Sequence, residues 1–214
     1  MIRKLFQGLV VSSLIVLVPV LVGNPVMLRS PKLWILVVIG VLASLFQPRY
    51  NPFGRSPNAK DKGTAAQIIW SIYLIQLSIL IEAAYFRYPA SISWSMLTAL
   101  SLGLMVSGLA IRTWAVFTLG KDFTWHISTR ENQAVMESGP YAFVRHPGYF
   151  GAFLTYTSTA LFLNAWISFI LSIFVLAAAF LRRITHEERE LKLKLGASYE
   201  SYCQRVKSFL PGIW

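Results

Sequence analysis

The sequence has little charge and very few acidic residues. Only nine of its 214 residues are Asp or Glu, and charged residues of all kinds make up 14% of the chain. Hydrophobic residues make up 55%, and the mean hydropathy is +0.55. A soluble domain of this length needs a more polar surface than that composition supplies. The composition therefore excludes an ordinary soluble domain and indicates an integral membrane protein.

Cysteine is nearly absent as well. Because Cys203 is the single cysteine, an internal disulfide framework and a cysteine-based zinc site are excluded. His126 and His186 do not stand at a familiar metal-ligand spacing from acidic residues, so we expect no metal. The net charge is +11, but the basic residues lie between apolar runs and form no single stripe. We therefore expect no nucleic-acid partner.

Six apolar runs predict an all-α polytopic membrane protein with five to six transmembrane segments. A bilayer core of ~30 Å needs about 20 helical residues. The last two runs are separated only by Asn164 and Ala165, which predicts a tight helical hairpin that either crosses fully or turns back within the membrane. The first run follows Arg3 and Lys4 without a small-x-small cleavage site, so we interpret it as a retained span. The runs cover residues 5–22, 33–46, 68–85, 94–111, 149–163 and 166–181.

The distribution of positive charge predicts the orientation. If the six runs alternate and the N-terminus is cytoplasmic, 17 of the 20 Lys and Arg residues lie on the cytoplasmic side. Both termini are then cytoplasmic, in a bacterial inner membrane or the endoplasmic reticulum. We expect four N-terminal transmembrane helices in residues 1–111 and a cofactor-binding catalytic region in residues 112–214. Its cytoplasmic tail carries a stripe at helical spacing, namely Leu191, Leu195, Tyr199, Tyr202 and Val206.

Two polar clusters flank the predicted hairpin on the cytoplasmic side. In the first, Pro147 suits the first turn of a helix, which places His146 where free N–H groups attract negative charge. In the second, Arg183 and Glu187 are four residues apart and share a helix face, with Glu188 next to them. A simple loop-to-helix entry and an ordinary ion pair are the alternatives. Because both clusters fall on one side of the membrane, they can meet in one site.

The C-terminal half resembles the isoprenylcysteine carboxyl methyltransferase family over roughly residues 100–214. The resemblance rests on Arg112-Thr-Trp-Ala, on the run from Ser138-Gly-Pro-Tyr141 to Arg145-His-Pro-Gly-Tyr149, and on Arg183 with Glu187-Glu188. It implies a methyl transfer that depends on S-adenosylmethionine, with S-adenosylhomocysteine as product, at the cytoplasmic face of a helical membrane protein. The membrane lipids, a lipophilic small molecule or a prenylated substrate are the implied partners.

The resemblance also implies site residues. Glu187 corresponds to the family's cofactor carboxylate, and Arg183 to its substrate-contacting arginine, so these two are the candidate catalytic pair. Gln133 and Val135-Met136 depart from the family's usual residues, His and Leu-Val. The residues that would enclose the cofactor, besides Glu187, are Gln133, Ala134, Val135, Met136, Tyr141, His146, Pro147, Gly148 and Tyr149.

The chemistry of a prenylcysteine carboxylate fits these residues, but other classes stay open. A carboxylate is ionised at neutral pH, so its methylation needs placement by an Arg rather than a strong base. A phospholipid-amine or thiol acceptor would need a base, for which Glu188 or His126 is available. An NADPH-dependent sterol-reductase-like enzyme is a further alternative, suggested by the segment from Tyr199 to Cys203. The last is a non-enzymatic membrane protein, such as a transporter subunit or assembly factor.

Overall fold

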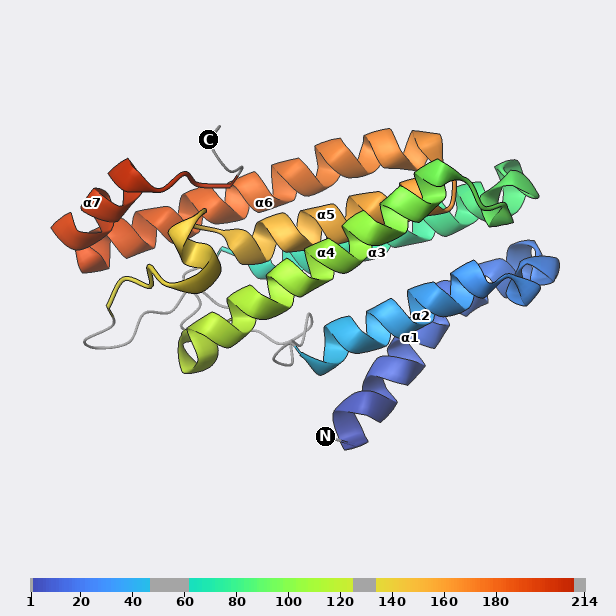
Figure 1. Cartoon of the computed structure of the whole chain (residues 1–214), viewed down its shortest axis with the longest axis horizontal. Helices are drawn as coiled ribbons and strands as arrows, with labels where there is room; N and C mark the ends of the chain where they lie inside the picture. The colour runs from blue at the N-terminus through green and yellow to red at the C-terminus, as the bar shows by residue number, and fades with distance from the viewer. Residues whose placement is uncertain (1, 47–61, 125–133, 210–214) are drawn as a thin grey trace.

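The computed structural model describes residues 2–46, 62–124 and 134–209, and these residues are helical apart from turns, connecting segments and one isolated parallel bridge between Val144 and Lys207. In the described residues, helices α1 to α6 run along the length of the molecule, and the short α7 lies at one end (Figure 1). The helices are α1 (Ile2–Gly23), α2 (Pro31–Leu45), α3 (Thr64–Ile81), α4 (Met96–Leu119), α5 (Pro147–Phe162), α6 (Trp166–Leu195) and α7 (Ala197–Arg205).

The helices are apolar enough for a multi-pass membrane protein. Four of the described helical stretches have the length and hydropathy to cross a bilayer, and α2 is a shorter apolar helix. The predicted all-α, polytopic fold is confirmed, while the number of spans stays a prediction. The hairpin of α5 and α6 turns at Leu163, Asn164 and Ala165, with Asn164 in the left-handed region at φ 53°.

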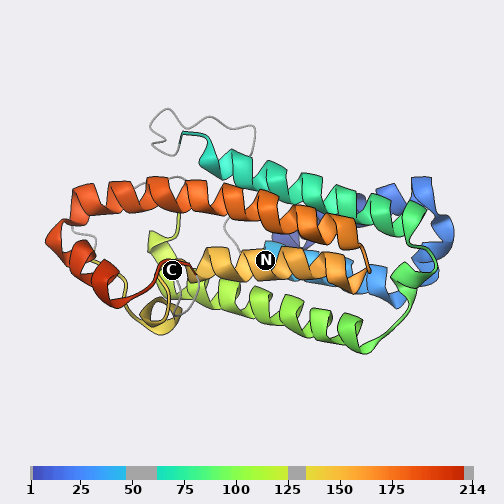
Figure 2. The same ribbon diagram turned by 90° about the horizontal axis from the view of Figure 1, so that it is seen from above.

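Helices α3, α4, α5 and α6 form one group, and the α1–α2 pair packs on one side of it (Figures 1 and 2). The closest pairing is α4 with α5. It depends on glycine, because a Cβ built on Gly108 would lie 2.6 Å from the Gly151 carbonyl oxygen, and one on Gly151 would lie 2.5 Å from that of Gly108. The backbones touch at this point, which leaves no room for a side chain on either residue.

The connections α1–α2, α3–α4 and α5–α6 meet at the end of the bundle away from α7. The buried Lys32 ammonium donates to the carbonyl oxygens of Phe162 (2.8 Å) and Ser91 (3.3 Å), and thereby links all three hairpins. Glu82 is buried at the same end. Its carboxylate accepts from the N–H of Ser168 (2.7 Å) at the start of α6 and pairs with Arg87 (3.0 Å).

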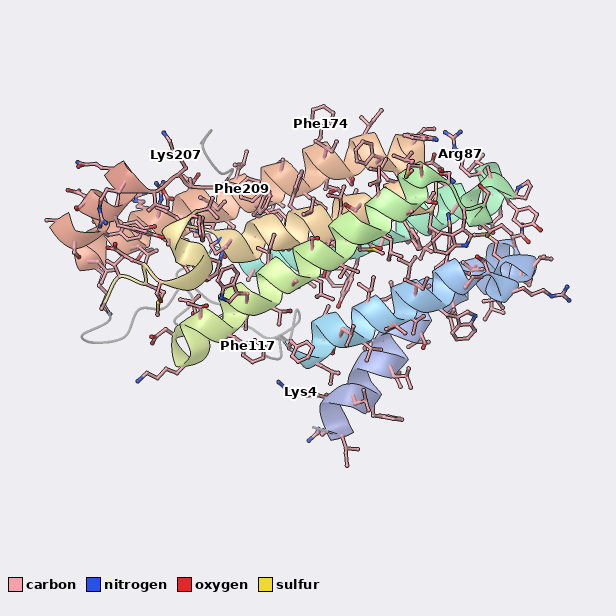
Figure 3. All side chains as sticks on the ribbon, viewed as in Figure 1. Lys4, Arg87, Phe117, Phe174, Lys207 and Phe209 are labelled. Carbon is pink, nitrogen blue, oxygen red and sulfur yellow. The ribbon has the colours of Figure 1, made fainter. Side chains whose placement is uncertain are left out.

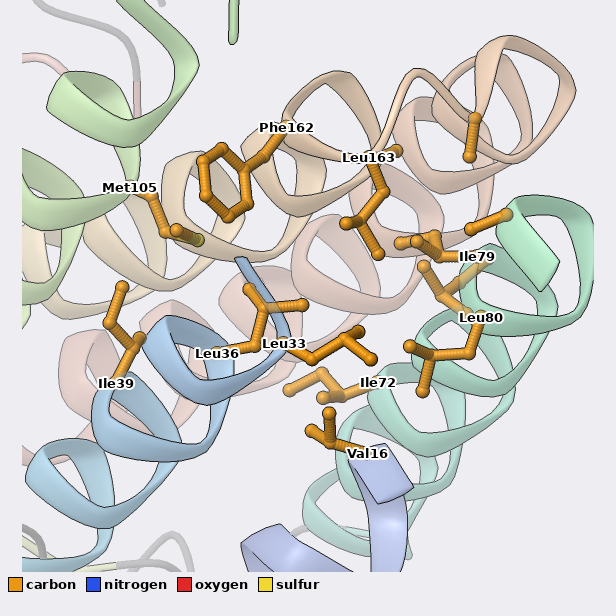
Figure 4. Close-up of a cluster of buried hydrophobic side chains, with 14 of the residues drawn as sticks. Val16, Leu33, Leu36, Ile39, Ile72, Ile79, Leu80, Met105, Phe162 and Leu163 are labelled. Atoms are coloured by element: carbon orange, nitrogen blue, oxygen red, sulfur yellow. The ribbon is translucent and has the colours of Figure 1, made fainter. Parts of the chain in front are cut away.

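The apolar core lies between the α1–α2 pair and the other helices (Figure 4). Leu33 and Leu36 of α2 face Ile72 and Ile79 of α3, and Phe162 closes the cluster from α5 (Figure 4). Many large apolar side chains point outward instead, as expected where the surrounding medium is lipid. The core thus holds together the end of the bundle that is away from α7.

Two helix boundaries differ from those that the apolar pattern predicts. The predicted fourth run ends at residue 111, but α4 continues to Leu119, because Arg112 is buried and donates to the Gly148 carbonyl oxygen (2.9 Å). The apolar stripe of the tail does not lie on one helix either. Gly196, at φ 54°, ends α6 and begins α7, so the stripe is divided between two helices. Its residues Leu191, Leu195, Tyr199 and Tyr202 nevertheless line one common pocket.

Candidate active site

A pocket opens at the α7 end of the bundle. Its walls come from α3, α4, α5, α6, α7 and the segment 134–136, so it gathers residues that are more than 130 positions apart in the sequence. Apolar side chains of α3, such as Ile68 and Ile72, line the side toward the bundle, and Tyr199 and Tyr202 line it from α7. The pocket therefore joins a polar end to an apolar interior.

The entry to α5 carries most of the polar residues. Gly139 takes φ 60°, and a short 3-10 turn leads to the Arg145–His146 pair. The backbone N–H groups of this pair donate to the carbonyl oxygens of Lys207 (2.8 Å) and Ser208 (3.0 Å). Pro147 then begins α5, where its missing N–H costs no hydrogen bond. The C-terminal tail thus holds in place the Arg145–His146 segment, which belongs to the first polar cluster of the sequence analysis.

Arg183, Glu187 and Tyr149 form one hydrogen-bonded group in the pocket. The Tyr149 hydroxyl donates to the Glu187 carboxylate (2.7 Å) and accepts from Arg183 Nε (3.1 Å). Arg183 Nε also lies 3.7 Å from Glu187 Oε2 and its Nη1 donates to the Thr64 hydroxyl (3.0 Å). Arg183 is 3% exposed, so its geometry is held from several sides. The Tyr149 ring stacks on His146 at 5.6 Å.

Glu188 has different hydrogen-bond and ion-pair partners from its neighbour Glu187. Its Oε1 lies 2.8 Å from Arg145 Nη2, 3.1 Å from His146 Nε2 and 3.0 Å from the Ser208 hydroxyl. A carboxylate with these partners anchors the α5 entry and the tail to α6. It is therefore a poor proton acceptor for an amine or thiol.

The hydroxyl groups of Tyr141 and Tyr202, which lie outside the long helices, stay neutral at physiological pH. Burial raises the pKa of the Tyr141 hydroxyl, and the nearby Glu187 carboxylate raises it further. Burial likewise raises the pKa of Tyr202, whose hydroxyl donates to the Tyr141 carbonyl oxygen (2.6 Å). Both groups are donors or aromatic walls here, and neither supplies a phenolate base.

The structure brings most of the predicted site residues together. Gln133 and His126 lie outside the described residues, and Pro147 starts α5 without lining the pocket. Sequence reasoning gave no role to Arg112 and missed Thr64. Arg112 was part of the motif that carries the family resemblance, and its position next to a long apolar run could have indicated a buried role, whereas Thr64 carries no such signal. The predicted residues that line the pocket are Ala134, Val135, Met136, Tyr141, His146, Gly148, Tyr149, Arg183 and Glu187.

Fold and pocket together define a class: an all-α, multi-pass membrane protein whose polar site opens at one end of a helical bundle. A model of the isoprenylcysteine carboxyl methyltransferase family matches residues 101–193. The probable protein-S-isoprenylcysteine O-methyltransferase of Oryza sativa subsp. indica is 31% identical over 175 residues, which cover 81% of this chain and 88% of that protein.

Two further comparisons agree. The protein-S-isoprenylcysteine O-methyltransferase of Schizosaccharomyces pombe is 32% identical over 130 residues, which cover 58% of this chain and only 55% of that protein. A solved structure described as the eukaryotic intramembrane Ras methyltransferase, isoprenylcysteine carboxyl methyltransferase, has the same fold. Its TM-score is 0.66 at 20% identity, covering 95% of this chain and 74% of the other. The chain belongs to the isoprenylcysteine carboxyl methyltransferase family, as the sequence motifs predicted.

Proposed function

We propose that this protein transfers a methyl group from S-adenosylmethionine to the carboxylate of a prenylcysteine-like acceptor. The observation that carries the proposal is the pocket itself, which unites Arg183, Glu187 and Tyr149 with the α5 entry and continues into an apolar wall. Membership of a methyltransferase family supports the reaction type. The chemistry of the residues supports the choice of donor and acceptor.

The residues fit the donor. S-adenosylmethionine supplies an electrophilic methyl group on a sulfonium cation and carries a zwitterionic amino-acid tail. The pocket offers the Glu187 carboxylate to positive charge, and the aromatic side chains of Tyr141 and Tyr149 line it beside that carboxylate. The segment from Ala134 to Met136 lines the same pocket.

The residues also fit a carboxylate acceptor. Arg183 can hold an ionised carboxylate in a charge-assisted hydrogen bond, and Thr64 and Tyr149 fix the guanidinium. Placement is the main requirement, because the acceptor needs no deprotonation. Glu188 is occupied by Arg145, His146 and Ser208, so an amine or thiol acceptor would have no carboxylate base in that position.

An apolar cavity beside the pocket suits a lipid tail. It lies between α1, α2, α3 and α5, and it shares Ile69, Ile72 and Tyr156 with the pocket wall. A prenyl chain would therefore pass laterally between helices while its carboxylate reaches Arg183. The polar donor would arrive from the water at the α7 end, on the cytoplasmic side.

Arg183→Ala should lower kcat/KM for a prenylcysteine acceptor by about tenfold or more, since a hydrogen bond to a charged group contributes about 1.5–3 kcal/mol. Methyl transfer is measured on the purified full chain, with Arg182→Ala as matched control. Arg182 is exposed and bonds Gln67 instead. Activity of Arg183→Ala within about twofold of the parent would show that Arg183 does not orient the acceptor.

Glu187→Gln should weaken binding of S-adenosylhomocysteine, because the neutral amide no longer attracts the cationic end of the ligand. Calorimetry on the detergent-purified protein measures this, with NADPH in a parallel titration. Glu200→Gln is the control, since Glu200 is exposed on α7. Binding of NADPH alone would favour a reductase, and binding of neither ligand would favour a non-enzymatic protein.

A further inference from the structure

A groove with unbalanced positive charge lies on the outer face of the junction between α6 and the C-terminal tail. Arg189 and Lys192 of α6 line one side and Lys207 of the tail the other. All three side chains are exposed, and within the described ranges none has a carboxylate partner. Arg145 also reaches the groove, but Glu188 already neutralises it. Three positive charges thus face one another across an open groove.

The length of α6 indicates that the groove lies near the depth of lipid phosphates. At 1.5 Å per residue, the 30 residues of α6 extend about 45 Å, roughly 15 Å more than the hydrocarbon core needs. If its apolar start at Trp166 fills the core, about 20 residues are used by residue 185. Arg189 and Lys192 then lie about 6–10 Å beyond, within the headgroup region.

The same side of α6 offers a place for an acyl chain. Leu171 and Phe174 are 45% and 70% exposed in the apolar half of the helix. They precede Thr185, Arg189 and Lys192 on the same face of α6. That face is formed by positions three or four residues apart, namely 171, 174, 178, 182, 185, 189 and 192. Phe174 and Lys207 project from the same side of the molecule (Figure 3). Along this face of α6, exposed apolar residues are therefore followed by basic residues. An acyl chain and the phosphate of one phospholipid would meet them in the same order.

We propose that this groove binds the phosphate of an anionic glycerophospholipid whose acyl chain lies along α6. The bound phosphate bridges α6 to the tail through Arg189, Lys192 and Lys207. The tail in turn holds the candidate active site, because the Lys207 carbonyl oxygen accepts from the Arg145 N–H and the Ser208 hydroxyl bonds Glu188. An anionic lipid therefore fastens the tail, which holds the entry to α5. This inference does not depend on the reaction that the pocket performs.

Native mass spectrometry of the detergent-purified full chain tests the proposal with phosphatidylglycerol and phosphatidylcholine of the same acyl chains. The parent should retain phosphatidylglycerol preferentially. The Lys192→Gln, Lys207→Gln double variant should bind it about thirtyfold more weakly, since each basic residue contributes roughly 1 kcal/mol at an anionic surface. Arg189→Gln should weaken it in the same direction. Lys121→Gln, an exposed change elsewhere at this end, is the matched control.

Two further measurements separate a lipid from other anions. Excess inorganic phosphate should not displace the lipid, because free phosphate lacks the acyl contact with Leu171 and Phe174. Hydrogen exchange of residues 206–209 should slow when phosphatidylglycerol is added to the parent and not to the double variant. Equal retention of both lipids, displacement by phosphate, or unchanged affinity in the double variant would each overturn the proposal. Thermal unfolding without added lipid confirms that the variants are folded.

Discussion

Among single side chains, Thr64 shows how the pocket depends on residues outside the two motifs. It is the first residue of α3, fully buried, and its hydroxyl accepts a hydrogen bond from Arg183 Nη1 at 3.0 Å. Together with the Tyr149 hydroxyl, it fixes the guanidinium plane from two directions. A guanidinium so held loses little conformational freedom when it binds a carboxylate. Thr64 is therefore a positioning residue for Arg183.

Thr64→Val keeps the shape of the side chain and removes the hydroxyl. It should raise KM for the acceptor about tenfold, because one hydrogen bond to a charged group is lost, with a smaller change in kcat. Thr64→Ser should restore most of the loss. Binding of S-adenosylhomocysteine should stay the same in both variants, which calorimetry checks. A merely structural role would instead lower the thermal stability and the cofactor affinity together.

The neighbouring carboxylates Glu187 and Glu188 show the limit of residue-level reasoning. Both stand on the same helix, and the sequence alone could assign Glu187 only through the family resemblance. Their different surroundings arise from elements far apart in the chain: Tyr149 meets one, and Ser208 with Arg145 meets the other. No local pattern encodes those partners, because they depend on how the tail folds back.

Among helices, the contact between α4 and α5 determines the position of the pocket. Gly151→Ala would place a Cβ 2.5 Å from the Gly108 carbonyl oxygen and 2.7 Å from the Arg112 nitrogen, both backbone atoms that cannot rotate away. The helices must separate, at a cost of about 1–3 kcal/mol. We expect a lower unfolding temperature in detergent and weaker cofactor binding, since Arg112 then loses the Gly148 carbonyl.

Gly103→Ala is the matched control on α4. Nothing lies within 4 Å of a Cβ built there, and alanine favours a helix over glycine by about 1 kcal/mol. This variant should be unchanged or slightly more stable. If Gly151→Ala unfolded at the same temperature as Gly103→Ala, the close approach of the two helices would not hold in the protein.

Helix positions followed from the sequence more closely than helix ends. The two residues between the last apolar runs gave the hairpin, because a gap that short leaves room only for a tight turn. The end of α4 did not follow, since Arg112 was taken to end an apolar run while its buried hydrogen bond to Gly148 compensates the charge. The break at Gly196 was hidden by an apolar stripe that continues across it.

In the molecule as a whole, the two ends of the bundle differ in structure. One end is closed by the Lys32 and Glu82 contacts, which join three hairpins. The other end holds the pocket and the tail (Figure 1). The packed end and the candidate active site thus lie at opposite ends of the bundle axis.

The predicted orientation places the pocket on the cytoplasmic side, where positive charge is concentrated. In a Cys203→Ser background, Val26→Cys reports on the closed end and Ser201→Cys on α7, because both positions are exposed. A membrane-impermeant maleimide applied to intact cells should label position 26 and not 201, and permeabilisation should expose 201. Inverted vesicles should give the opposite pattern. Labelling of position 201 in intact cells would reverse the orientation. The donor would then have to reach the pocket from outside, which would contradict the proposed use of a cytoplasmic cofactor.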